Sequence, residues 1–269
     1  MVRFMMQLTT RTLAEEFALT ETGDGWQARV DQSWRGWTGP HGGVIAALLV
    51  EVACEAATDP LPVRAVDLRF LGRPTEGALT FHATEHTVGR STAVLEVRAD
   101  QDGSPIAAAA VTLGRTLATG VDDYAGEPAP EAPGPEACAK FALPPEIVPV
   151  GAHFDIRPCT GPLPLTGADE RMMCAWIALV PPLPTNAATL AVLADALPPA
   201  VFPTLHAPVA VPTVAQSMYL HGEPAGQQPV LVRAENASTG GGWSVDDISI
   251  WNQDGQLLAS ARQTRRVLG

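Results

Sequence analysis

The chain has 269 residues, 46% of them apolar, which is enough for one large domain or for two domains of about 100 to 150 residues each. Its formal charge of −12 argues against a nucleic-acid surface, because phosphate binding needs clustered Lys and Arg, and only 17 are spread along the chain. An anionic ligand would therefore need a local basic site.

The N-terminal sequence MVRFMMQLTTRTLAEEF contains neither the apolar segment nor the small-residue cleavage site of a secretory signal. The apolar run VIAALLV at 44–50 is too short to span a bilayer. The four cysteines, Cys54, Cys138, Cys159 and Cys174, lack the CxxC or Cys/His spacing of a metal site. These features predict a cytoplasmic chain with reduced thiols and with no metal and no membrane partner.

The segment HGGVIAALLVEVACEAA at 41–57 predicts a helix that is apolar on almost every side. Between Val44 and Ala57 only Glu51 and Glu55 are charged, and their i, i+4 spacing places both on one narrow face. Such a helix is a buried one, so we expect a sheet to wrap it.

The segment 119–148 differs from the rest of the chain in composition. Seven prolines lie between Pro128 and Pro149, together with several acidic residues. Because this composition forms neither a helix nor a central strand, we predict an extended linker between residues 1–118 and 149–269.

The parts before and after the linker share one pattern. Each contains an apolar helical stretch, then a strand that runs into Gly-x-Pro, then a hairpin with a Gln-Asp-Gly turn. The helical stretches are 41–57 and 185–197, the strands are 63–74 and 213–224, and the hairpins are 91–115 and 243–267. Identity between the copies is low, so chance similarity between two amphipathic hairpins is the alternative explanation.

A central helix cradled by a curved antiparallel sheet is the hotdog fold. Two copies in one chain predict an α+β double hotdog, with repeats at 1–118 and 149–269. The alternative is an ordinary α+β sandwich of helix on sheet. Two such chains could associate through sheet edges as a homo-oligomer, although no residue requires it.

Three segments resemble the acyl-CoA thioesterase II-like, double-hotdog superfamily. WTGPHGGVIAALL at 37–49 resembles the entry to its first central helix, and PTVAQSMYLH at 212–221 resembles a strand of its second repeat. GGGWSVDDISIWNQDGQLLASARQTRRV at 240–267 resembles the closing strands. The resemblance implies hydrolysis of acyl-CoA to free acid and CoA, with no cofactor, no metal and no covalent acyl-enzyme.

The resemblance also implies a catalytic set: an aspartate on the second central helix, a Ser or Thr opening the next strand and a glutamine in the last strand. Asp195, Thr213 and Gln263 match these positions. The sequence departs from the family at two places. Ala215 and Gln216 replace an acidic residue and a histidine, and Gly222 replaces the arginine that usually follows His221 and would hold a CoA phosphate.

Asp195 is the only charge in the apolar run ATLAVLADALPPA, and thioester hydrolysis needs a base to activate water. Thr213 and Gln263 could hold that water or the thioester carbonyl, and their counterparts in the first copy are Val63 and Val111. Polar residues in one copy and apolar residues at the equivalent positions of the other are expected if one repeat carries a single active site. Alternatively, Asp195 faces water at a helix end, Thr213 is an ordinary strand residue and Gln263 is a surface residue.

The triplet His41-Gly42-Gly43 opens the first helix, where free backbone N–H groups can approach a substrate carbonyl. A turn that needs two glycines for packing is equally compatible. His41 also supports a rival activity, because hotdog hydratases and dehydratases use a histidine with a carboxylate, here Asp195. A non-catalytic acyl-CoA binding protein is the third hypothesis, prompted by Gly222.

Arg262, Arg265 and Arg266 cluster near the end of this acidic chain. They could meet the CoA phosphates. The alternative is a solvated strand end.

Overall fold

A computed structural model of the protein describes residues 11–122, 124, 126–142, 145–221 and 228–268. The expected absence of a leader at residues 1–10, and the substitution at Gly222, lie outside these residues. No helix in the described part combines the length and the apolar character needed to cross a membrane.

Twelve strands form one antiparallel sheet, with few helices, as expected of an α+β chain. The first half contains α1 (Leu13–Glu16), β1 (Thr20–Thr22), β2 (Gly25–Val30), α2 (Gly42–Ala56), β3 (Val63–Phe70), β4 (Gly77–Val88), β5 (Thr92–Gln101) and β6 (Ser104–Gly114). The second contains β7 (Phe154–Thr160), β8 (Met172–Leu179), α3 (Ala187–Leu193), β9 (Thr213–Leu220), β10 (Val230–Gly240), β11 (Trp243–Trp251) and β12 (Leu257–Arg266). Four short 3₁₀ helices complete the described structure. Both predicted hairpins are present.

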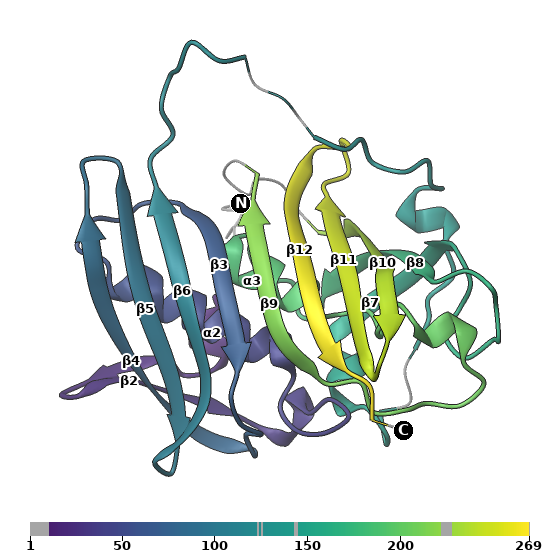
Figure 1. Cartoon of the computed structure of the whole chain (residues 1–269), viewed down its shortest axis with the longest axis horizontal. Helices are drawn as coiled ribbons and strands as arrows, with labels where there is room; N and C mark the ends of the chain where they lie inside the picture. Colours follow the sequence, from purple (N-terminus) through teal and green to yellow (C-terminus); the bar gives the residue numbers. More distant parts are fainter. Residues whose placement is uncertain (1–10, 123, 125, 143–144, 222–227, 269) are drawn as a thin grey trace, which may run out of the picture.

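The sheet order is β1-β2-β4-β5-β6-β3-β9-β12-β11-β10-β8-β7. Read outward from the centre, each half has the same order: β3, β6, β5, β4, β2 on one side and β9, β12, β11, β10, β8 on the other. The halves meet where β3 pairs with β9, and helices α2 and α3 lie behind this sheet (Figure 1). At the junction Asp67 pairs with Ser217, whose Oγ donates a hydrogen bond to Asp67 Oδ1 at 2.6 Å.

Helix α2 agrees with the predicted helix to within one residue at each end. Every residue from Gly43 to Val50 is buried, and the helix contacts four strands, β3 to β6. Burial raises the pKa of Glu51, and the neighbouring charge of Glu55 raises it further. The sheet therefore wraps this helix as its apolar sequence predicts.

Helix α3 is shorter than the predicted stretch 185–197. It begins after Asn186, whose side chain accepts from Thr189 N at 2.8 Å while its own N–H donates to Thr189 Oγ1 at 2.9 Å. The helix ends at Leu193, and Ala194 is its C-cap. Asp195 therefore lies in the turn after the helix and not within it.

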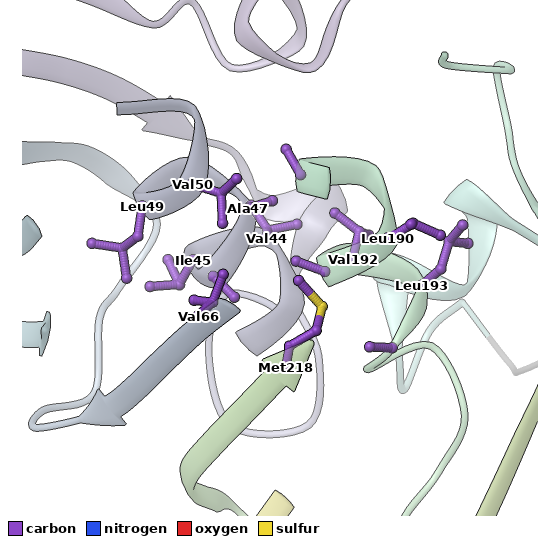
Figure 2. Close-up of a cluster of buried hydrophobic side chains, with 14 of the residues drawn as sticks. Val44, Ile45, Ala47, Leu49, Val50, Val66, Leu190, Val192, Leu193 and Met218 are labelled. Atoms are coloured by element: carbon purple, nitrogen blue, oxygen red, sulfur yellow. The ribbon is translucent and has the colours of Figure 1, made fainter. Parts of the chain in front are cut away.

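The two helices pack side by side at the centre of the molecule. In Figure 2, Val44 and Ala47 of α2 lie toward Leu190 and Val192 of α3, while Ile45 points toward Val66 of β3. The side chains of Val66 on β3 and Met218 on β9, which are opposite each other in the sheet, close the base of this core. The end of α3 is thereby brought close to the start of α2.

The predicted linker crosses from β6 to the second half of the sheet (Figure 1). Its described residues form no α-helix and no strand, and Pro135–Ala137 is a single 3₁₀ turn. The segment is docked onto the sheet, because Trp251 Nε1 donates to Glu127 O at 3.0 Å and Trp176 Nε1 donates to Pro133 O at 2.8 Å. It therefore covers apolar strand residues as well as joining the halves.

Candidate active site

In each half of the sheet, two rows of residues pair across three neighbouring strands. These rows are apolar in the first half and polar in the second. In the first half the rows are Val66, Val111 and Leu95, and then Val63, Leu113 and Ala93. The corresponding rows of the second half are Gln216, Gln263 and Asp246, and then Thr213, Arg265 and Ser244. Among the described residues, the polar rows therefore gather in one half only.

Asp195 projects from the turn after α3 toward this polar cluster and toward α2. Its Oδ2 accepts a hydrogen bond from Gly43 N at 3.0 Å, and its Oδ1 accepts one from Gln263 Nε2 at 3.1 Å. The guanidinium of Arg265 lies 3.5 Å from Oδ1, and the Asp195 side chain is 13% exposed. The carboxylate is thus held by the protein on several sides and does not face bulk water.

The start of α2 supplies the positive end of a helix dipole to this carboxylate. A Cβ added to Gly43 would lie 2.9 Å from Ala191 O of α3, and one added to Gly42 would lie 3.0 Å from Asp195 Oδ2. Both glycines therefore allow close approach. Within the described chain the Gly42 N–H donates to no protein atom, which leaves it available to a ligand.

His41 is the N-cap residue of α2 and is only 8% exposed. Its Nε2 lies 2.9 Å from the main-chain oxygen of Asp195 and 3.6 Å from Asp195 Oδ2. Its Nδ1 is buried without a partner among the described residues. Nearby, His153 stacks on Trp34 with ring centroids 3.8 Å apart, and burial lowers the pKa of His153, which favours its neutral form.

Gln263 is fully buried behind Asp195 and is not part of the described cavity wall. Its Nε2 donates to Asp195 Oδ1 and to Gln216 Oε1, the latter at 2.9 Å. Its Oε1 accepts from Arg265 Nη2. All its strong hydrogen-bonding groups are therefore engaged with protein, so Gln263 acts on Asp195 and does not reach a substrate directly.

Thr213 joins the site through Arg265. Its Oγ1 accepts from Arg265 Nη1 at 2.9 Å, and the residue lines the cavity. Arg265 is 6% exposed and its Nε lies 2.9 Å from Asp246 Oδ2. The structure thus brings Asp195, Thr213 and Gln263 around one buried guanidinium.

The cluster of three arginines does not behave as a unit. Arg265 points inward, pairs with the buried Asp246 and lies on the cavity wall, so it is not a solvated strand end. Arg262 lies on the opposite face of β12, where its Nε pairs with Asp247 at 2.6 Å. Arg266 lines the cavity. The overlay of the two halves places Arg265 opposite Leu113, which is the sequence signal that marks it.

A cavity of about 620 Å³ opens beside Asp195. Its wall includes Asp195, His41, Gly42 and Thr213. Most buried residues of the wall are apolar, among them Ile45, Val148, Val150, Phe154 and Phe202, while His41 and Arg265 are buried polar members of it. Exposed residues at its rim include Trp37, Leu71 and Arg73. The charged residues on the described wall are Asp195 and three arginines, Arg73, Arg265 and Arg266. The cavity therefore combines a mainly apolar interior with an excess of positive charge.

Ala215 and Gln216 stand where the family usually has an acidic residue and a histidine. Gln216 is buried and accepts a hydrogen bond from Gln263, whereas Ala215 has no polar side-chain group. At the second departure from the family, His221 Nε2 lies 2.9 Å from Ser260 Oγ and is outside the described cavity wall. Neither residue approaches Asp195 directly.

Three solved structures share this fold along nearly their whole length. A hot dog fold protein of unknown function from Alicyclobacillus acidocaldarius has a TM-score of 0.88 and 23% identity, over 97% of this chain and 99% of its own. A putative thioesterase II from Thermobifida fusca has a TM-score of 0.83 and 20% identity, over 97% and 98%. A putative thioesterase from Novosphingobium aromaticivorans has a TM-score of 0.80 and 24% identity, over 94% and 99%.

A search of curated protein sequences finds no match to the chain. Two family models match it in order. The model of the acyl-CoA thioesterase N-terminal domain matches residues 30–114, and that of the acyl-CoA thioesterase C-terminal domain matches residues 123–267. Together with the hot dog fold, these matches place the chain in the acyl-CoA thioesterase family.

Proposed function

We propose that the chain hydrolyses acyl-CoA thioesters through a water molecule activated by Asp195. The observation that carries this proposal is the Asp195 carboxylate on the cavity wall, fixed by Gly43 N at 3.0 Å and Gln263 Nε2 at 3.1 Å. A general base must be held within reach of the water whose proton it takes. Membership of the family supports thioester hydrolysis as the reaction.

In the proposed reaction the water oxygen attacks the thioester carbonyl carbon while Asp195 takes one water proton. The Gly42 N–H, free within the described chain, stabilises the oxyanion at the positive end of α2. Thr213 holds the water or the carbonyl by its hydroxyl. The carbon–sulfur bond then breaks, and the proton on Asp195 passes to the leaving thiolate, which gives a free acid and a thiol.

The cavity supports an orientation for the substrate. The buried apolar wall, which includes Ile45, Val150 and Phe154, suits an acyl chain. The exposed rim carries Arg73, and Arg266 also lines the cavity. In a chain with a net charge of −12 these are the side chains that suit the phosphates of CoA.

We also propose that the fold is a double hotdog, with repeats at 1–118 and 149–269 joined by 119–148. Support comes from the equal strand order of the two halves and from the central pairing of Asp67 with Ser217. In this arrangement the first repeat packs against the second, and supplies Gly42 and Gly43 to the site.

The direct test is purified protein with a panel of acyl-CoAs of different chain lengths, in which release of free thiol is followed. Hydrolysis of at least one member is expected, with medium or long apolar chains preferred over polar acyl groups. Saturable binding without turnover across the whole panel would instead favour the acyl-CoA binding protein.

Replacing both Arg73 and Arg266 by glutamine is expected to raise KM for acyl-CoA about tenfold, equivalent to ~1.4 kcal/mol, with little change in kcat. The physical reason is the loss of two positive charges that face the CoA phosphates and not the thioester. The measurement is steady-state kinetics at low and high salt, because added salt should shrink the difference.

The matched control for this pair is Arg98→Gln with Arg262→Gln, which removes the same charge from exposed positions outside the described cavity wall. It should retain the parent KM. An equal rise in KM for both pairs would mean that overall charge, and not the cavity, attracts the substrate.

One observation favours a rival, a hydratase that acts on enoyl-CoA. His41 Nε2 lies 3.6 Å from Asp195 Oδ2, and a histidine beside a carboxylate is the pair that such hydratases use. The rival leaves Thr213 and Gln263 without a role. It predicts an absorbance change with an enoyl-CoA that His41→Ala abolishes and Gln263→Ala does not, whereas thioester hydrolysis predicts thiol release that depends on Gln263.

A further inference from the structure

We infer that Arg265, held in place by Asp246, is a positioning residue that fixes the direction of the hydrogen bonds in the active site. The inference rests on the proposed function and assigns a role that the catalytic set does not contain. Arg265 touches Thr213, Gln263 and Asp246, and lies 3.5 Å from Asp195.

The first step is that a guanidinium can only donate hydrogen bonds. Gln263 must therefore present its Oε1 to Arg265 Nη2, and its NH₂ group must face the other way. That NH₂ group is the one that donates to Asp195 Oδ1 at 3.1 Å and to Gln216 Oε1 at 2.9 Å. Arg265 thus decides which end of the Gln263 amide meets the carboxylate.

The same logic applies to Thr213. Its Oγ1 accepts from Arg265 Nη1 at 2.9 Å, so the hydroxyl proton cannot point at Arg265. The proton is left to donate elsewhere, and Thr213 lines the cavity. Arg265 therefore turns Thr213 into a donor toward the water or the thioester carbonyl.

Asp246 supplies the opposite charge that a buried arginine requires, as an ion pair and not as a well-aligned hydrogen bond to Arg265 Nε. It is almost completely buried, and its Oδ2 lies 2.9 Å from Arg265 Nε and accepts from Ala200 N at 3.2 Å. Its Oδ1 accepts from Asn236 Nδ2 at 2.9 Å and lies 3.4 Å from Ser244 Oγ. Because Asp246 is fixed by three other groups, it compensates the charge of Arg265 and also sets its position.

The first half of the sheet shows which apolar residues can replace Arg265 and Asp246 in a test variant. Its residues at the same register positions are Leu113 for Arg265 and Leu95 for Asp246, both fully buried. The double variant Arg265→Leu/Asp246→Leu removes both members of this pair at once, so that neither is left as an unpaired buried charge. The matched control is Arg262→Leu/Asp247→Leu, the same two residue types on the same two strands but on the exposed face.

With the preferred acyl-CoA, the inner double variant is expected to fold and to lose kcat by about 10- to 100-fold while KM stays within about twofold of the parent. The control should keep both constants. A folded inner variant with the parent kcat overturns the inference. If that variant does not fold, Arg265→Lys provides the test. Lysine keeps the charge beside Asp246 but lacks the planar guanidinium that donates to Thr213 and Gln263 in fixed directions. A tenfold loss of kcat supports the inference, and full activity overturns it.

Failure of the proposed function is seen separately, as a parent protein that hydrolyses no acyl-CoA. In that event crystal structures of the parent and of the inner variant, or of Arg265→Lys, give the readout. Loss of the Gln263 Nε2 contact with Asp195, or rotation of Thr213, supports the inference. A variant that keeps both side chains in place overturns it.

Discussion

Asp195→Asn is expected to lower kcat for the preferred acyl-CoA by about 10²- to 10⁴-fold, the range that a general base contributes. The amide has nearly the shape of the carboxylate but cannot take a proton from water. Thiol release under saturating substrate measures the change. The retained cavity should leave binding of the substrate nearly intact.

The environment of Asp195 makes a fold control necessary. Both of its oxygens are acceptors, one for Gly43 N and one for Gln263 Nε2. An amide turns one acceptor into a donor that would face either the Gly43 N–H or the Gln263 NH₂ group, so some stability is lost as well. Thermal unfolding of the variant separates the two effects.

The matched control is Asp67→Asn on the exposed face of the sheet, where the Asp67 side chain accepts a hydrogen bond from Ser217 and from no other described residue. It is expected to retain the parent kcat. If Asp195→Asn also retained it in a folded protein, Asp195 would not be the base.

The internal comparison of the two halves explains why much of the site could be predicted from sequence. A polar residue that is buried at a position where the equivalent residue is apolar needs a reason beyond folding, since the same backbone is stable with valine or leucine there. The sequence overlay shows the contrast for Thr213 against Val63 and for Gln263 against Val111, and the sheet register agrees. Gln263 is fully buried and Thr213 is partly buried.

The same comparison does not identify Asp246, because the turns of the two hairpins differ in length. Aligning the two Gln-Asp-Gly turns places Val94 over Asp246, whereas the sheet places Leu95 there. The first hairpin has two residues between its strands, Gln101 and Ser104 being the ends, and the second turn is longer. Because a slip of one residue exchanges the two faces of a strand, the sequence alignment puts Asp246 on the wrong face.

The burial of Arg265 could not be predicted, for an electrostatic reason. An arginine near the end of an acidic chain is usually a surface residue, and its burial is affordable only beside a buried carboxylate. That carboxylate is on the neighbouring strand, so the pair exists only once the register is known. The end of α3 was likewise missed, because the apolar run continues beyond Leu193 although the helix does not.

Gly43→Ala is expected to lower the free energy of unfolding by about 1–3 kcal/mol, the usual cost of inserting a methyl group into a packed core. The new Cβ would lie 2.9 Å from Ala191 O, a backbone atom of α3 that cannot move alone. The helices must separate, which also breaks the Gly43 N contact with Asp195. We expect a lower Tm and a lower kcat together, measured by thermal unfolding and by thiol release.

Gly42→Ala is expected to separate these two effects. Its Cβ would meet Asp195 Oδ2 at 3.0 Å, the free end of a side chain that can turn away, and alanine favours a helix over glycine by about 0.5–1 kcal/mol. Stability should therefore hold while kcat falls. Gly240→Ala, where a Cβ meets nothing within 4 Å, serves as the control. Parent-like kcat in Gly42→Ala would mean that the carboxylate need not sit against the start of α2, so a pair of glycines there would serve helix packing alone.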